Sequence, residues 1–175
     1  VETEYVPVLG ALLATRRPRG PGERQVFAAH VAAVEGETLG SLQFETDRNR
    51  FLGRGRSPRD PISVVGGRPL SGSVGAVLDP LFSLRVRVRI APGEKARVAF
   101  STIIAPTQEE AIDLADKYRD PGTFGRIMTL AWTQAQVQLH HLGIAPDEAQ
   151  LFQRLANRVL YSDPTLRPPA EVLGR

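Results

Sequence analysis

The residues best suited to chemistry lie in one short stretch, Glu45–Arg56, where arginines and carboxylates surround one phenylalanine and two glycines. Arginine carries a planar, bidentate fork that matches carboxylate and phosphate groups. Packing alone gives no reason for so many arginines in a connecting segment. The candidate glycan- or interface-contact residues are therefore Asp47, Arg48, Arg50, Arg54 and Arg56.

Glu45 and Asp47 form the one plausible carboxylate pair for glycoside cleavage in the first part of the chain. Glycosidases need two carboxyl groups that flank the scissile bond. At positions i and i+2 of a strand the two side chains share one face, which leaves little room for a sugar between them. We favour an ion network with Arg48, Arg50 or Arg54, and we predict no catalytic residue in this stretch.

Three uses of the arginines in Glu45–Arg56 stay open. They can brace a domain interface, which we favour, contact a glycan, or bind nucleic acid. We disfavour nucleic acid as a partner because only Phe44 and Phe51 are near enough to stack on bases. Gly53 and Gly55 would let backbone N–H groups approach an anion. The strand–glycine-loop–helix motif of nucleotide sites is missing, so we expect no cofactor.

The other candidate groups favour packing over chemistry. His140 and His141 are neighbours on a predicted helix and cannot chelate as an i, i+4 pair does, so we expect no metal site. Trp132 has the character of a sugar-stacking platform, but we favour a place in the core. The chain has no cysteine, which removes disulfides and thiolate chemistry.

Charge is distributed unevenly along the 175 residues. Residues 1–106 carry 15 basic and 10 acidic side chains, whereas residues 107–163 carry 5 basic and 8 acidic ones. The isoelectric point of about 9.8 is compatible with an anionic partner. No apolar run approaches the roughly 20 residues of a membrane-spanning helix.

Residues 1–105 have the patterns of β-strands. Apolar runs over 6–15 and 25–34 are separated by a turn-rich break, and Gly36–Gly40 predicts a second turn. Leu84–Ile90 alternates aliphatic residues with arginines at period two, and Ala96–Ala105 places Val98, Phe100, Thr102 and Ile104 on one face. The turn at 91–94 predicts that these two strands form an antiparallel hairpin.

After Pro106 the period becomes helical. Thr107 and Glu110 form a capping-box pattern that predicts a helix to about Tyr118. A second helix is predicted over about 123–142 and a third over about 146–161. The second helix is apolar on more than one side, which is typical of a helix packed between two bodies.

These patterns predict an α+β protein, with part of an antiparallel β-sandwich of the supersandwich kind followed by three α-helices. The predicted domains are 1–105 for the sandwich portion, 106–163 for a helical linker and 164–175 for an extended tail. The chain opens within a predicted strand and ends in a Pro-rich segment, and we therefore expect it to be a piece of a longer protein. An open sandwich edge would permit self-association.

Residues 1–5, 11–19 and 45–56 resemble the β-sandwich region of cyclic β-1,2-glucan synthases, which belong with the phosphorylases of glycoside hydrolase family 94. The later segments 78–85, 131–136 and 151–156 resemble the same family, in order. The resemblance implies a sandwich that precedes an α/α-barrel catalytic domain of the same parent chain and packs against it. It also implies a parent at the cytoplasmic side of the bacterial inner membrane.

In that family phosphorolysis inverts the anomeric centre, and one aspartate of the barrel acts as general acid. No residue of this chain matches that aspartate, so the resemblance implies a non-catalytic fragment of a glucan-processing enzyme, with β-1,2-glucan as a candidate partner. The alternative is a free-standing basic module that binds an anionic partner such as nucleic acid or polysaccharide.

Overall fold

A computed structural model describes residues 1–161 and 168–173 of the chain. It divides into two compact units, Val1–Arg126 and Ile127–Arg175. This division falls later than the predicted border at 105/106, because helix α3 (Gln108–Tyr118) packs on the sheet and belongs with the strands. The division lies inside helix α4 (Pro121–Leu142).

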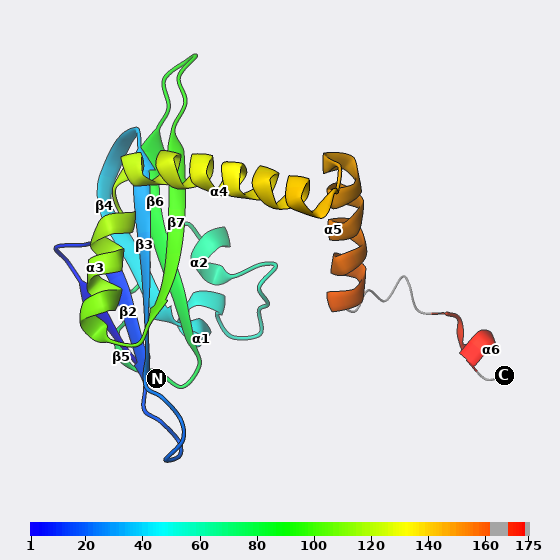
Figure 1. Cartoon of the computed structure of the whole chain (residues 1–175). Coiled ribbons are helices and arrows are strands. Elements are labelled where there is room, and N and C mark those ends of the chain that lie inside the picture. The colour runs from blue at the N-terminus through cyan, green and yellow to red at the C-terminus, as the bar shows by residue number, and fades with distance from the viewer. Residues whose placement is uncertain (162–167, 174–175) are drawn as a thin grey trace. The chain divides into compact units, whose positions relative to one another are not determined.

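Two antiparallel sheets make up most of the first unit (Figure 1). One has the order β5-β1-β2-β3-β7, and the other consists of β4 and β6. The strands are β1 (Glu2–Val6), β2 (Ala11–Arg16), β3 (Val26–Glu35), β4 (Glu37–Asp47), β5 (Gly75–Ala76), β6 (Pro80–Arg89) and β7 (Arg97–Ala105). The predicted α+β class with antiparallel sheets followed by helices is confirmed.

The apolar run predicted as one strand over 6–15 is broken by a turn. Leu9 N–H donates to the Val6 carbonyl at 3.1 Å, and Gly10 N–H donates to the Pro7 carbonyl at 3.2 Å. Pro7 has no N–H to give to a ladder, and Gly10 has a positive φ of 61° that suits glycine. The run therefore supplies the end of β1, a turn and β2.

The predicted hairpin of residues 84–105 is wrong, because β6 and β7 belong to different sheets. β6 pairs with β4 up to Glu37↔Arg89, whereas β7 pairs with β3 up to Glu35↔Arg97. The chain crosses between the sheets at Gly36 and again after β6. A Cβ on Gly36 would lie 3.1 Å from the Cβ of Ala96, so the two crossings touch at this corner. The turn predicted at Gly36–Gly40 is shorter in the structure: only Gly36 lies between β3 and β4, which begins at Glu37.

Helix α3 covers one face of the five-stranded sheet and completes the main core. Ala111 and Ala115 are fully buried against Ala29, Val31 and Ile103. Alanine at both helix positions lets the backbone approach the sheet closely. On β7 the buried side chains are Ile103 and Ala105, whereas Val98, Phe100, Thr102 and Ile104 are exposed.

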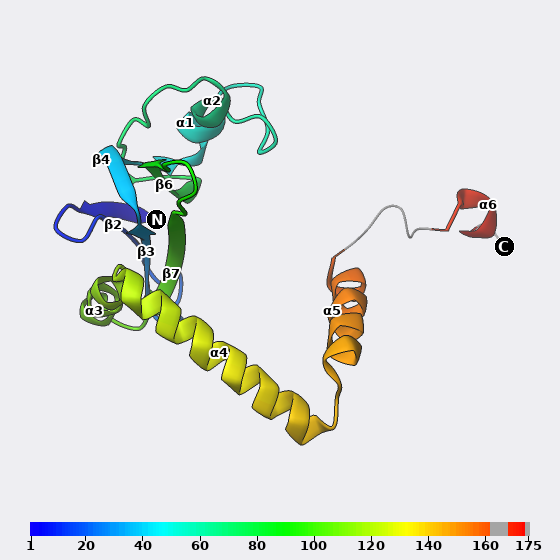
Figure 2. The same cartoon turned by 90° about the horizontal axis from the view of Figure 1, so that it is seen from above.

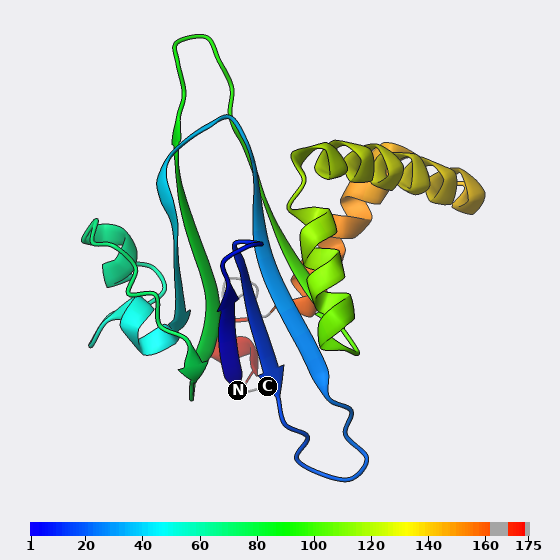
Figure 3. The same cartoon turned by 90° about the vertical axis from the view of Figure 1, so that its left-hand side faces the viewer.

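The other face of that sheet packs against β4 and β6, so the layers run α3, large sheet, small sheet (Figures 2 and 3). Tyr5 stacks on Phe44 with ring centroids 4.0 Å apart, and the Thr3 and Thr46 hydroxyls are 2.8 Å apart. His30 stacks on Phe82 of the small sheet, with centroids 5.6 Å apart. His30 thus takes part in joining the two layers.

Protonation of His30 should destabilise the first unit. Burial lowers the pKa of this imidazole from its usual 6.5, so the unfolded chain binds the proton more tightly than the folded chain. Stability should therefore be full above pH ~6.5 and fall as the pH drops from there through the folded-state pKa. Urea unfolding between pH 7.5 and 5 (roughly the His window) checks this.

The control for this pH dependence is His140, which is exposed. His30→Gln should flatten the pH dependence in that range, and His140→Gln should leave it unchanged. A profile unaffected by His30→Gln would contradict the assignment.

The three predicted helices lie close to where the sequence places them, as α3, α4 and α5 (Pro146–Leu160). The short α1 (Arg48–Leu52) and α2 (Ile62–Val65) and the single turn α6 (Ala170–Leu173) were not predicted. The tail predicted as extended over 164–175 therefore contains a helical turn, and residues 164–167 and 174–175 lie outside the described residues. Among the described residues, none of the helices combines the length and apolarity needed to cross a bilayer.

Candidate functional site

The arginine-rich stretch Glu45–Arg56 is the end of β4 followed by the short helix α1. Asp47 is the N-cap of α1: its Oδ1 accepts from the backbone N–H groups of Asn49 at 2.8 Å and Arg50 at 3.4 Å. The Asp47 carboxylate therefore satisfies helix donors that have no intrahelical partner. Its role in the structure is to begin a helix.

Gly53 ends α1 and brings it against α2. Its φ is 83°, and a Cβ there would lie 2.9 Å from Cγ2 of Ile62. Its N–H donates to the Asn49 carbonyl at 2.9 Å, so this donor is not available to an anion. The glycine serves the close approach of two short helices.

The arginines of the stretch are exposed and weakly tied. Arg48 lies 3.6 Å from Asp79 and Arg50 lies 3.7 Å from Asp47. Arg56 donates to the Asp60 carbonyl at 3.1 Å. Among the described residues, Arg54 makes no hydrogen bond or ion pair. Such pairs hold the guanidinium groups loosely, at the surface and accessible to a partner.

Replacing Arg54 and Arg56 together by Ala should change the free energy of unfolding of this chain by only ~0–1 kcal/mol, because their contacts are exposed. A matched control is Arg85, which donates to the carbonyls of Arg68, at 2.7 Å, and Ser63. Arg85→Ala should cost about 1.5–3 kcal/mol, because hydrogen bonds from charged groups are stronger. Chemical denaturation measures both. Equal losses in the two variants would show that Arg54 and Arg56 hold the fold.

Glu45 is the feature that sequence reasoning placed wrongly. Glu45 is 1% exposed, and its carboxylate pairs with no arginine among the described residues. One oxygen accepts from the backbone N–H groups of Thr46 and Asp47, both at 3.0 Å, and from the Ser73 hydroxyl. The other accepts from the Ser71 hydroxyl. The predicted ion network therefore holds for Asp47 with Arg50, and not for Glu45.

Burial raises the pKa of Glu45, but the hydrogen bonds from Ser71, Ser73 and the backbone outweigh it and hold the pKa below its usual 4.5. A signal was present in the sequence: two serines at i and i+2, Ser71 and Ser73, follow a loop that must return to the sheet. Thr46 adds to the same network by donating to the Ser73 carbonyl at 2.8 Å. Glu45 thus ties the segment before β5 to β4.

This geometry does not assemble a glycosidase pair. Glu45 is buried and fully hydrogen-bonded, and Asp47 caps a helix, so neither is placed to flank a bond of a substrate. Within the described part of the chain, no three His, Asp or Glu side chains gather closely enough to hold a metal ion. The stretch instead presents exposed arginines on α1 and the loop that follows it. Asp47, Gly53 and Glu45 fix the backbone of this segment.

Known proteins place the chain in a family. Residues 1–121 match the profile described as the Glycosyl hydrolase 94 supersandwich domain. The chain therefore belongs to this family of supersandwich domains, which the resemblance in its sequence had predicted. It is a domain of a kind found in carbohydrate-active enzymes.

The cyclic beta-(1,2)-glucan synthase NdvB of Rhizobium meliloti (strain 1021) is 41% identical to the chain over 159 residues. The match covers 91% of this chain and 6% of that protein. The chain therefore spans a small part of the relative's length, and the similarity continues past the family match into the helices that follow the sandwich.

Proposed function

We propose that this chain is a non-catalytic scaffold within a larger enzyme of the cyclic β-1,2-glucan synthase type, in which it packs against an α/α-barrel catalytic domain. The observation that carries the proposal is the apolar surface of α5. Phe152, Leu155 and Val159 recur at helical spacing, and each is more than half exposed, with Val159 at 85%. An apolar stripe of this kind is normally buried against another body.

The second half of α4 supports the same reading. Leu130, Trp132 and Val137 are exposed, with Trp132 at 66%, so the core position predicted for Trp132 is wrong within this chain. The sequence prediction that α4 is packed between two bodies fits these side chains if the second body is the barrel. Apolar surface on two successive helices is more than a solvated linker needs.

The large sheet has an uncovered apolar area of its own. Phe100 is 54% exposed and Ile104 is 72% exposed on β7, which is the edge strand of its sheet. A bare edge with apolar side chains is a site for pairing with further protein. In the parent we expect other parts of the enzyme to cover it, and in the isolated chain it is the edge through which self-association would occur.

In this proposal the chemistry lies outside the chain. The barrel supplies the general acid, and the arginines of Glu45–Arg56 brace the interface or contact β-1,2-glucan. The finer form of the proposal is a parent that phosphorolyses glucan at the cytoplasmic side of the inner membrane, as the family resemblance implies. The name of the relative supports glucan synthesis. A free-standing basic module for an anionic partner is the alternative.

A paired comparison in the full-length enzyme and in this chain tests the scaffold role. Phe152→Ser with Val159→Ser should lower the glucan-processing activity of the full enzyme at least ~10-fold, because the barrel would lose its packing partner. The same change should alter the unfolding free energy of the chain by less than about 0.5 kcal/mol, since both side chains are exposed there. Gln153→Ser with Asn157→Ser is the matched control on the same helix.

Two results would overturn the proposal. The first is release of glucose 1-phosphate when this chain alone is incubated with sophorose and phosphate. The second is full activity of the Phe152, Val159 variant in the intact enzyme. Salt-sensitive retardation of DNA that is lost with Arg54→Ala and Arg56→Ala would favour the binding-module alternative.

A further inference from the structure

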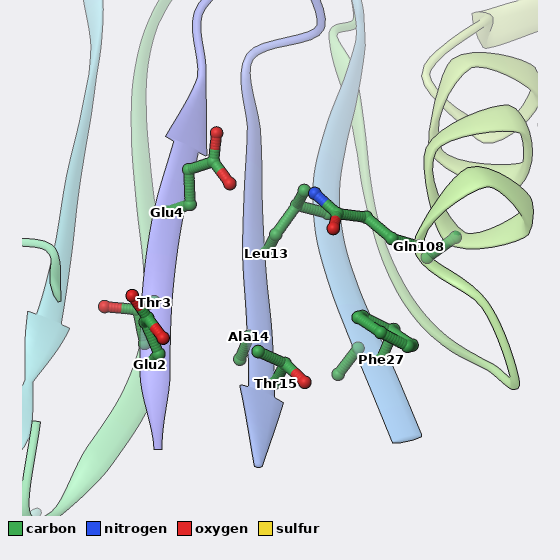
Figure 4. A pocket seen from close by; sticks show the side chains of 10 residues that line it. Glu2, Thr3, Glu4, Leu13, Ala14, Thr15, Phe27 and Gln108 are labelled. Carbon is green, nitrogen blue, oxygen red and sulfur yellow. The ribbon is translucent and has the colours of Figure 1, made fainter. Parts of the chain in front are cut away.

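A pocket on the α3 side of the large sheet is separate from the arginine-rich stretch and from the exposed apolar surfaces. It has a volume of about 370 Å³ and lies where β1, β2 and β3 meet the start of α3 (Figure 4). Ligand pockets in proteins commonly begin near this size. Its walls carry Glu2 and Glu4 from β1 and Gln108 from α3, and Leu13 and Phe27 supply apolar surface.

Three polar side chains of the pocket are available to a ligand, whereas the hydroxyls of Thr3 and Thr15 hydrogen-bond elsewhere. Among the described residues, the side chains of Glu2, Glu4 and Gln108 make no hydrogen bond or ion pair. Glu2 and Glu4 are two positions apart on β1 and therefore point to the same face of the sheet. Figure 4 shows Glu4 and Gln108 on either side of Leu13, so a carboxylate acceptor and an amide donor flank an apolar side chain.

We propose that this pocket binds a neutral sugar, one or two glucosyl residues of a glucan chain. Two carboxylates and an amide match the hydroxyl groups of a sugar, because hydroxyls donate to carboxylates in charge-assisted hydrogen bonds and accept from an amide N–H. Leu13 and Phe27 match the apolar C–H face of the ring. This inference rests on the proposed function for the glucan as the source of the sugar.

Other ligand classes fit the lining less well. An anion has no partner, since no Lys, Arg or His of the described part of the chain lines the pocket. A divalent cation needs more oxygen ligands than two carboxylates supply, and among the described residues no group of three candidate ligands gathers there. A hydrated cation also gains nothing from the apolar floor that Leu13 and Phe27 provide.

Binding is measured by amide chemical shifts of the 175-residue chain during titration with sophorose, the β-1,2-linked glucose disaccharide. We expect saturable shifts at Leu13, Thr15, Phe27 and Gln108, with a dissociation constant on the order of 1 mM, as suits a few hydrogen bonds in an open site. Glu2→Gln with Glu4→Gln should weaken binding about 10-fold, because the charge-assisted bonds become neutral ones. These side chains are exposed, so the variant stays folded.

The matched control removes two carboxylates that lie away from the pocket. Glu35 pairs with Arg97 at 3.1 Å and Glu37 with Arg89 at 3.0 Å, and Glu35→Gln with Glu37→Gln should leave sophorose binding unchanged.

Three results would overturn the pocket assignment. They are no shifts with sophorose, shifts confined to the arginine-rich stretch, and shifts at the pocket caused by calcium chloride but not by sophorose. Each would leave the scaffold test on α5 standing, because that test measures activity of the full enzyme and involves no residue of the pocket.

Discussion

Replacing Glu45 by Leu should destabilise the first unit by about 3–5 kcal/mol, since each buried donor left without an acceptor costs about 1–3 kcal/mol. Leucine removes the acceptor of the Thr46 and Asp47 N–H groups and of the Ser71 and Ser73 hydroxyls. The site is 1% exposed, so water cannot replace the carboxylate. Equilibrium unfolding in urea measures the loss.

Glu45→Gln separates hydrogen bonding from charge. Its amide oxygen can keep the two backbone donors, so it should cost less than Glu45→Leu. It should also remove part of the acid sensitivity: the lowered pKa of Glu45 means that its stabilisation is present above pH ~4.5 and is lost as the pH falls through the folded-state pKa. If the Glu45→Leu variant were as stable as the unsubstituted 175-residue chain, the buried hydrogen-bond network would not hold the segment before β5.

Replacing Ala115 by Leu should destabilise the first unit by about 1–3 kcal/mol, because the added side chain has no space between α3 and the sheet. Ala115 is fully buried, as is Ala111 one turn earlier. Thermal and urea unfolding should both report the loss. The matched control is Ala135→Leu on α4, where the alanine is exposed and the same substitution should stay within about 0.5 kcal/mol.

The Ala115 comparison also tests the division of the chain. If α3 belonged with the helical linker, as the predicted border at 105/106 has it, Ala115→Leu and Ala135→Leu should have similar small effects. A clear difference supports the unit Val1–Arg126.

Helix positions were predictable because their signals are local. Thr107 caps α3 by accepting from the Glu110 N–H at 3.2 Å, as its pattern predicts, and Gly143 follows α4 with a φ of 65°. Strand partners were not predictable in the same way. The alternation in 84–90 and 96–105 fits a hairpin and a corner between sheets equally well, since pairing depends on β3 and β4 far along the chain.

The arginine-rich stretch could be found from composition, but its internal arrangement could not. Asp47 became a helix cap and Glu45 a buried acceptor because a bulge between them changes the register of β4 against β6. Period-two reasoning placed both carboxylates on one face. The resemblance to glucan synthases predicted the family. Pattern and charge alone left the function open between a scaffold and a basic binding module.

In the scaffold role that we propose, the apolar surfaces of α4 and α5 are covered in the intact enzyme. Hydroxyl-radical footprinting of Trp132 and Phe152, in this chain and in the full-length protein, measures this coverage directly. Both side chains are more than half exposed in the chain. We expect their modification rates to fall several-fold in the full enzyme, as for side chains at a buried interface. Equal rates in the two proteins would contradict the scaffold role.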